Sequence, residues 1–333
     1  MERRRLGTSD LELPVVTLGT WAIGGTSWGG ADDDAAVEAI HAAIDHGVSA
    51  IDTAPIYGFG HSEEVVGRAI RGRRHQVEIL TKCGLRWDTD EGEFVMESKT
   101  LDGLPVSIYK NLTADSIIHE CENSLKRLGI DVIDLYQVHW PSTSAPADET
   151  MGALVRLKEQ GKIREIGVSN YSSAQLEEAR SYAPIFSNQI EYSLLSREIE
   201  NDELPYCRNN DLAILVYSPM HLGLLTGKVT MDRKFPKNDL RHKLPWFQPE
   251  NRRRVLEAIT TLRDIAEARQ ATISQVAVAW TLHQPGVASA LVGARNRAQA
   301  IENAGAGLIR LLPQDISALT TTFDRLTLDS STS

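Results

Sequence analysis

Apolar residues along the chain fall into short runs that alternate with longer amphipathic segments. Eight runs are short and rich in Val, Ile or Leu, which is typical of strands that are covered on both faces. These predicted strands span residues 15–19, 48–52, 77–82, 132–139, 163–169, 185–189, 212–218 and 287–292. Helical spacing between the runs indicates a chain that alternates strand and helix.

Several predicted helices have recognisable ends. The clearest span residues 33–46, 113–128, 148–160 and 251–269. The first three stop at a glycine, which is a common helix terminus. Two further helices are expected to open with capping boxes, formed by Ser172 with Gln175 and by Thr272 with Gln275.

Eight strands, each followed by a helix, predict a (β/α)8 TIM barrel of class α/β with an N-terminal β-hairpin. We expect one domain over residues 1–333, with long loops at about 84–112 and 220–250 and a tail at 311–333. Both loops follow strands, so they are expected on the C-terminal face, where barrel active sites lie. A doubly wound sheet is the alternative, but no Gly-rich dinucleotide fingerprint follows any predicted strand.

Composition and charge exclude several classes of function. The 333 residues carry a net charge of −10, and the isoelectric point is about 5.4, which argues against nucleic acid as a partner. No apolar run approaches the length of about 20 residues that a membrane helix needs, and no metal-binding motif is present. Three cysteines and a polar start predict a cytoplasmic protein, which we expect to be a monomer.

Four titratable residues follow three consecutive predicted strands. Asp52 ends the second strand and Tyr57 follows it, Lys82 ends the third, and His139 ends the fourth. These positions converge at the C-terminal mouth of a barrel. We expect the buried lysine to lower the pKa of the tyrosine, and the carboxylate to hold the lysine. The tyrosine would then be a proton donor for an alkoxide that forms on a carbonyl carbon.

The sequence resembles the aldo-keto reductases over nearly its whole length. Residues 47–70, GVSAIDTAPIYGFGHSEEVVGRAI, look like the family signature, and ILTKCG, LYQVHW, IGVSN, NQIEYSLL and VYSPM follow in the family's order. The resemblance implies the catalytic tetrad Asp52, Tyr57, Lys82 and His139. In it Tyr57 is the general acid, Lys82 and Asp52 tune it, and His139 orients the carbonyl.

The resemblance also implies a nicotinamide cofactor held in the barrel mouth. Ser169, Asn170 and Gln189 would hold its carboxamide, and Tyr217 would stack on its ring. The other implied cofactor residues are Gly19, Thr20, Trp21, Asp52, Ser218, Met220, Leu222, Lys228, Arg241, Gly293, Arg295, Gln299, Glu302 and Asn303.

One departure concerns the 2′-phosphate of NADPH. Many family members have Lys at the position of Gly293 and Arg at that of Gln299. This chain instead resembles a bacterial branch and the potassium-channel β subunits. Arg295 is the remaining obvious cation that could bind the 2′-phosphate, and Arg297 and Arg241 could assist it. We therefore expect NADPH as the cofactor and NADH as a weaker alternative.

The segments GTWAIGG and WGGADDD and the long third loop resemble the bacterial branch that reduces short hydroxyaldehydes such as glyceraldehyde. The expected function is therefore NADPH-dependent reduction of small carbonyl compounds, aldehydes to primary alcohols. Aromatic and imidazole side chains are expected to form the substrate pocket. They are Trp21, Trp28, Tyr57, Trp87, His139 and Trp140.

Two alternatives stay open at this point. A regulatory subunit of the channel-β type would bind the cofactor with slow or no turnover, but those subunits carry Asn where this chain has His139. A barrel lyase or isomerase could use Lys82 as a Schiff base, which leaves Asp52, Tyr57 and the cofactor motifs unexplained.

Overall fold

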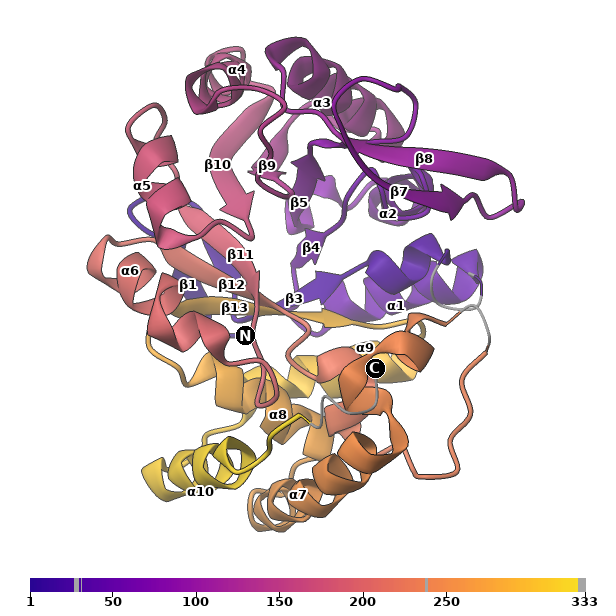
Figure 1. Cartoon of the computed structure of the whole chain (residues 1–333), viewed down its shortest axis with the longest axis vertical. Coiled ribbons are helices and arrows are strands. Elements are labelled where there is room, and N and C mark those ends of the chain that lie inside the picture. The colour runs from indigo at the N-terminus through magenta and orange to yellow at the C-terminus, as the bar shows by residue number, and fades with distance from the viewer. Residues whose placement is uncertain (27–29, 31, 237–238, 329–333) are drawn as a thin grey trace.

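Eight parallel strands close into a barrel that helices surround (Figure 1). The computed structural model describes residues 1–26, 30, 32–236 and 239–328. The barrel strands are β3 (Val16–Gly19), β4 (Ala50–Asp52), β5 (Glu78–Cys83), β9 (Ile133–Val138), β10 (Ile163–Ser169), β11 (Ser187–Glu191), β12 (Ala213–Tyr217) and β13 (Val287–Gly293). The closed ring confirms the predicted (β/α)8 barrel and excludes the doubly wound sheet, because such a sheet keeps open edges.

The helices are α1 (Asp33–Asp45), α2 (His61–Ile70), α3 (Ala114–Leu128), α4 (Ala147–Glu159), α5 (Ser173–Arg180), α6 (Glu203–Asn209), α7 (Pro249–Ala268), α8 (Ile273–Leu282), α9 (Arg297–Gly305) and α10 (Pro313–Asp324). Both predicted capping boxes are formed, at the starts of α5 and α8. The segment 311–333 was expected to be a tail, but it contains α10, which packs on α7. Among the described residues, no helix is long and apolar enough to cross a membrane.

Two apolar cores follow from the alternation of side chains along each strand. One set of residues packs outward against the helices and includes Ile79, Tyr136 and Val138. The other set points into the barrel and includes Leu80, Leu135 and Leu215. The barrel interior is therefore filled with side chains, mostly apolar ones, with a few buried hydroxyl groups such as those of Thr17 and Ser289.

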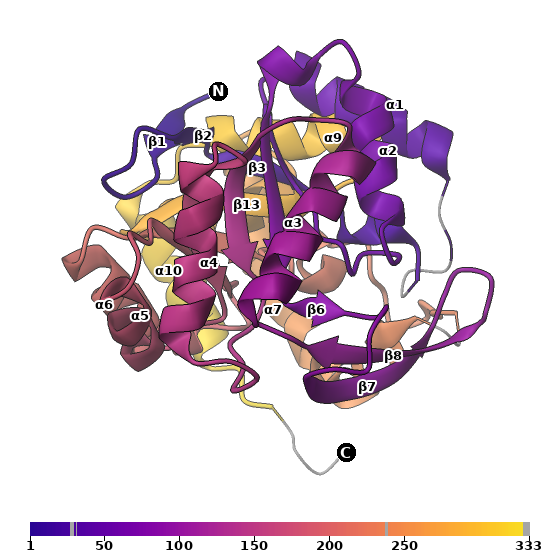
Figure 2. The same ribbon diagram turned by 90° about the horizontal axis from the view of Figure 1, so that it is seen from above.

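An N-terminal hairpin closes the bottom of the barrel. Its strands β1 (Arg3–Arg5) and β2 (Glu12–Pro14) pair antiparallel, as predicted. Leu6, Leu11 and Leu13 of this hairpin pack on the inward-facing core residues and are at most 2% exposed. In Figure 2 the hairpin lies at one end of the barrel and the insertion after β5 lies at the other. The open end is therefore the C-terminal one.

The insertion at 84–112 is a small sheet, which corrects the expectation of a loop. Strands β6 (Leu85–Arg86), β7 (Glu93–Lys99) and β8 (Pro105–Lys110) form an antiparallel sheet in the order β6-β8-β7. The segment EFVMESK contains three consecutive apolar residues, Phe94 to Met96, and Asp102-Gly103 provides the turn between β7 and β8. The sheet extends beside the barrel mouth (Figure 1).

The second long connection, 220–250, is built from short 3₁₀ turns rather than from a sheet. Its turns are η4 (His221–Thr226), η5 (Leu240–Lys243) and η6 (Pro245–Phe247), and the other 3₁₀ turns are η1 (Trp21–Gly24), η2 (Arg74–Gln76), η3 (Glu198–Asn201) and η7 (Ala306–Leu308). The chain turns sharply where it leaves β12, because Ser218, His221 and Leu222 all have positive φ. These turns bring the connection back over the strand ends.

Candidate active site

A cavity of about 750 Å³ opens at the C-terminal mouth of the barrel. Its walls come from the strand ends, the β5 insertion, the 220–250 connection and α9. It is lined by Gly19, Thr20, Trp21, Asp52, Ser169, Asn170, Gln189, Tyr217, Ser218, Met220, Leu222, Lys228, Arg241, Gly293, Arg295, Gln299, Glu302 and Asn303, all of them predicted cofactor residues. Arg297, which was expected to assist Arg295, is exposed and does not line the cavity. Positions spread over 280 residues of sequence therefore share one cavity.

The four predicted catalytic side chains lie together: Asp52, Tyr57 and His139 line the cavity, and Lys82 is fully buried beside them. The ammonium of Lys82 donates to Asp52 Oδ1 at 2.6 Å, to the carbonyl oxygen of Thr53 at 2.9 Å and to Tyr57 Oη at 3.2 Å. These three acceptors match the three N–H groups of an ammonium. The imidazole of His139 meets the Tyr57 ring edge-on, with the ring centroids 5.8 Å apart.

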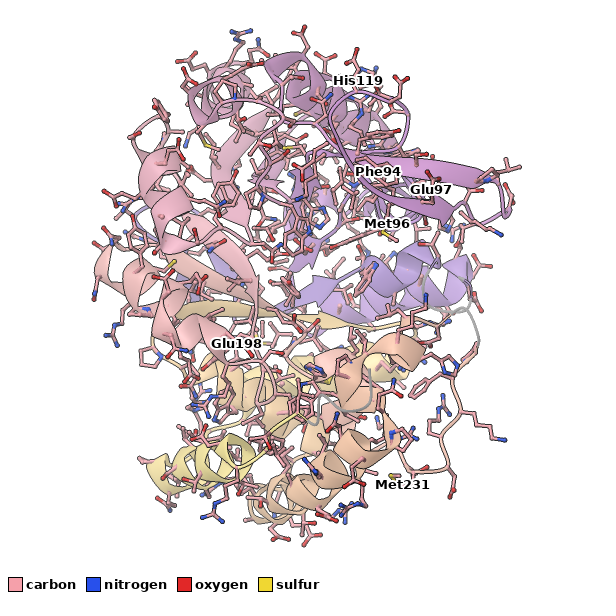
Figure 3. All side chains as sticks on the ribbon, viewed as in Figure 1. Phe94, Met96, Glu97, His119, Glu198 and Met231 are labelled. Carbon is pink, nitrogen blue, oxygen red and sulfur yellow. The ribbon has the colours of Figure 1, made fainter. Side chains whose placement is uncertain are left out.

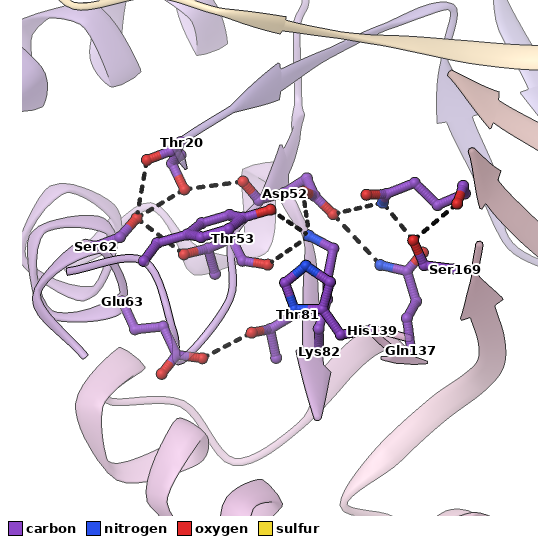
Figure 4. A network of polar contacts seen from close by, with 12 residues as sticks. Thr20, Asp52, Thr53, Ser62, Glu63, Thr81, Lys82, Gln137, His139 and Ser169 are labelled. Atoms are coloured by element: carbon purple, nitrogen blue, oxygen red, sulfur yellow. Dashed lines mark hydrogen bonds and ion pairs between the residues drawn. The ribbon is translucent and has the colours of Figure 1, made fainter. Parts of the chain in front are cut away.

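Two buried glutamines hold the second carboxylate oxygen of Asp52 (Figure 4). Gln189 Nε2 donates to Oδ2 at 2.9 Å, and Gln137 Nε2 donates to it at 3.3 Å. Gln189 Nε2 also lies 3.2 Å from Gln137 Oε1. Asp52 therefore connects β4 to β5, β9 and β11 through its side chain alone.

The loop that carries Tyr57 docks on η1 by a close backbone contact. Gly58 has a φ of 68°, and a Cβ atom there would lie 2.3 Å from the carbonyl oxygen of Gly24. Only glycine permits both this backbone conformation and this approach. The contact fixes the loop directly after Tyr57, and the Tyr57 ring lies 6.4 Å from that of Trp21.

Burial raises the pKa of Tyr57 above its ordinary value. The positive charge of Lys82 opposes this rise, as expected, but burial together with the negative charge of Asp52 outweighs it. The expectation of a lowered tyrosine pKa is therefore wrong, because the desolvation of a phenolate at this depth exceeds the attraction of one lysine that is already paired. The phenol is protonated at neutral pH.

The neighbours of Tyr57 have well-defined charge states. Burial opposes the charge on Lys82, but Asp52 beside it raises the pKa of the ammonium, so Lys82 stays charged. Burial, followed by the positive charge of Lys82, holds the pKa of His139 well below its ordinary value. His139 is therefore a neutral imidazole that can donate one N–H. A protonated phenol and a neutral imidazole thus lie side by side at the cavity end.

The residues expected to hold a carboxamide already bond to one another. Asn170 donates to the carbonyl oxygen of His139 at 3.1 Å and to Ser169 Oγ at 3.0 Å, and Tyr217 Oη donates to Asn170 Oδ1 at 3.0 Å. Because the amide N–H groups of Gln189 point at Asp52 and Gln137, its carbonyl oxygen is the part available to accept from a ligand.

Cations and a helix start lie along the rest of the cavity. Lys228 forms an ion pair with Glu302 at 2.7 Å, which links the 220–250 connection to α9. Arg241 is held by both carboxylate oxygens of Asp239. Arg295 Nη2 reaches the carbonyl oxygen of Gly30 at 3.3 Å. These groups fit a long anionic ligand such as a nicotinamide dinucleotide, because positive side chains and donors line a cavity that ends at the catalytic residues.

The predicted substrate residues separate into two groups. Trp21, Tyr57, His139 and Trp140 line the cavity. The structure places Trp87 behind the wall, where its ring packs edge-on against Phe59 at 5.6 Å and under the guanidinium of Arg127 at 6.0 Å. The expectation that Trp87 lines the pocket is corrected accordingly, and Trp28 lies outside the described residues.

Several residues of the site were missed from the sequence. Gln137 precedes His139 by two positions in a strand, so the period of two would have placed both on the inner face. Met96 and Ile108, from the insertion sheet, and Arg233 and Phe235, from the 220–250 connection, also line the cavity. Figure 3 labels Met96 on β7 beside the barrel mouth. No local pattern shows which long-loop residues fold back over the strands.

The match to known proteins agrees with this geometry. A model of the aldo/keto reductase family matches residues 15–322, and the chain belongs to that family. It is accordingly a nicotinamide-dependent oxidoreductase that acts on carbonyl compounds and alcohols.

Relatives extend over nearly the whole chain. Aldo-keto reductase YhdN of Bacillus subtilis is 42% identical over 302 residues, which cover 90% of this chain and 86% of that protein. NADH-specific methylglyoxal reductase of Escherichia coli is 39% identical over 325 residues, which cover 96% and 97%. Aldo-keto reductase yakc [NADP(+)] of Schizosaccharomyces pombe is 34% identical over 313 residues, which cover 92% and 87%.

Among solved structures, the glycerol dehydrogenase AKR11B4 from Gluconobacter oxydans is similar in fold and sequence. Its TM-score is 0.87 at 39% identity, and the match covers 98% of both chains. The similarity therefore includes both the barrel and the connections that form the mouth.

Proposed function

We propose that the protein reduces aldehydes to primary alcohols with NADPH, and that short hydroxyaldehydes such as glyceraldehyde are its substrates. One observation carries this proposal: a protonated Tyr57 hydroxyl, bonded to a charged Lys82, lies beside a neutral His139 at the end of the long cavity. When it is bound, the nicotinamide supplies the hydride.

Two side chains of the protein then bind and protonate the carbonyl oxygen of the substrate. His139 donates an N–H to that oxygen and orients the substrate. Tyr57 transfers its phenolic proton to the oxygen as negative charge develops there, and an alcohol results. The phenolate that remains is stabilised by Lys82, whose charge Asp52 maintains, and it regains a proton from solvent. Because His139 supplies an N–H donor to the carbonyl oxygen, it favours an enzyme that turns over substrate and not a purely regulatory subunit.

The preference for NADPH is assigned to Arg295. It lies on the cavity wall near the start of α9, and Gly293 and Gln299 beside it are uncharged. The named relatives include one NADH-specific enzyme and one described with NADP(+), so the cofactor varies among them.

Tyr57→Phe is predicted to abolish nearly all aldehyde reduction while NADPH still binds. General acid catalysis contributes about 10² to 10⁴-fold, and the cofactor contacts lie elsewhere in the cavity. Steady-state rates and fluorescence titration of NADPH measure the two effects. A variant within about threefold of the wild-type rate would show that Tyr57 is not the general acid.

Arg295→Ala is predicted to weaken NADPH binding far more than NADH binding. A charge-assisted bond to the 2′-phosphate contributes about 1.5 to 3 kcal/mol, which corresponds to about 10- to 150-fold in affinity. Titration of both cofactors measures the difference, and Arg208→Ala, at an exposed arginine that does not line the cavity, serves as the matched control. Equal losses for the two cofactors in Arg295→Ala would assign the 2′-phosphate to another cation.

Glyceraldehyde is predicted to be reduced with a higher kcat/KM than propanal, benzaldehyde or a steroid ketone at fixed NADPH. The indoles of Trp21 and Trp140 narrow the mouth and offer N–H donors to a substrate hydroxyl. A site that bonds a hydroxyl discriminates against analogues that lack it. Preference for propanal or for the steroid would contradict a hydroxyl-binding wall.

A further inference from the structure

Three buried hydroxyl groups lie directly behind the catalytic residues. Thr20 follows β3, Thr53 follows β4 and Ser62 lies in the first turn of α2, and all three are 0% exposed. Ser62 Oγ lies 2.8 Å from Thr20 Oγ1, 3.2 Å from the carbonyl oxygen of Thr20 and 3.0 Å from Thr53 Oγ1 (Figure 4). Thr20 Oγ1 lies 2.9 Å from the carbonyl oxygen of Asp52.

The direction of every bond in this group is determined, because each hydroxyl has one proton. A carbonyl oxygen can only accept, so Thr20 donates its proton to Asp52. Both oxygens of Thr20 near Ser62, its hydroxyl and its carbonyl, can then only accept, so the single Ser62 proton points at Thr20. Thr53 must therefore donate to Ser62. The result is a chain that runs from Thr53 through Ser62 and Thr20 to the Asp52 backbone.

Both ends of this hydrogen-bond chain lie at residues that contact the Lys82 ammonium. The carbonyl oxygen of Thr53 accepts one of the three bonds from the Lys82 ammonium, and Asp52 accepts another through its side chain. The backbone N–H of Ser62 donates to the carbonyl oxygen of Tyr57 at 3.1 Å. Ser62 therefore contacts the tyrosine loop through its backbone, and through its side chain it contacts Thr53, which follows Asp52, and Thr20, which bonds to the Asp52 carbonyl.

We infer that Ser62 is a positioning residue for the carbonyl reduction: its hydroxyl fixes Asp52 and Thr53 relative to Tyr57, and so sets the separation of the Lys82 ammonium from the phenol. The inference rests on the roles proposed above for Tyr57 and Lys82. A shift of about 1 Å in reacting groups costs up to about 10²-fold in rate, so small changes in this separation matter.

Ser62→Ala is predicted to lower kcat about tenfold or more, while the dissociation constant of NADPH stays within about twofold of wild type. Without Ser62 Oγ, the buried Thr53 hydroxyl loses its acceptor, and the strand end can shift. The matched control is Ser289→Ala, which also removes a 0% exposed hydroxyl with two bonds of 2.7 Å, to Thr17 and to the Pro14 carbonyl. Its kcat should stay within about twofold.

Three readouts separate positioning from general stability. The melting temperatures of the two variants should fall by similar amounts, whereas only Ser62→Ala should lose kcat. The kinetic isotope effect with deuterated NADPH should be at least as large in Ser62→Ala as in wild type, because the chemical step is the one that slows. Thr53→Val keeps the side-chain volume and removes the hydroxyl that donates to Ser62, so it should also lower kcat. If Ser62→Ala is too unstable to assay, Thr53→Val tests the positioning role in its place.

A wild-type kcat in Ser62→Ala, an equal loss in Ser289→Ala, or a reduced rate with a vanished isotope effect would overturn the positioning role. These outcomes leave the proposed function intact. By contrast, absence of aldehyde reduction by the wild-type enzyme, or full activity of Tyr57→Phe, contradicts the proposed function itself.

Discussion

The ion pair between Lys82 and Asp52 is the interaction on which the rest of the site depends. Its side chains are 1% and 3% exposed, and the charged atoms lie 2.6 Å apart. A buried pair of this kind is stable only when its remaining hydrogen-bonding capacity is satisfied, and removing one partner costs about 3–5 kcal/mol. Here the ammonium has three acceptors, and the carboxylate accepts from two glutamines as well as from the lysine.

This pair links the fold to the chemistry. The network joins residues near the ends of four different barrel strands: Asp52, Lys82, Gln137 and Gln189. Their hydrogen bonds therefore fix the positions of these strand ends relative to one another at the mouth. Leucines fill much of the barrel interior below this network, and the hairpin closes the bottom, so the charged pair lies at the open end. Tyr57 lies outside the barrel proper, and Lys82 and the hydroxyl chain determine where its phenol stands.

The sequence was sufficient for the parts of the structure that depend on local pattern. The barrel strands were predictable because each is a short apolar run, and the tetrad because polar residues end three consecutive runs. Gln137 was missed although the period of two points to it. The insertion sheet was also missed, because EFVMESK shows no alternation of apolar and polar residues and its apolar side chains Phe94, Val95 and Met96 stay exposed.

Other features depend on tertiary contacts that no local pattern shows. The pKa of Tyr57 rises because burial outweighs one lysine, and the depth of burial follows only from the folded loops. Trp87 lies behind Phe59 for the same reason, since the path of the insertion decides which side chain faces the cavity. Ser62 was missed because its partners, Thr20 and Thr53, meet only in the closed barrel.

The most direct measurement of this account is the ionisation of Tyr57 itself. The difference in near-ultraviolet phenolate absorbance between the wild-type protein and Tyr57→Phe, followed as pH rises, isolates this one residue. The account predicts that its phenolate forms only above the ordinary tyrosine pKa of 10.0, because burial keeps the phenol protonated as a donor beside the charged lysine. Ionisation of Tyr57 below that value would contradict it and would show that the Lys82 charge dominates.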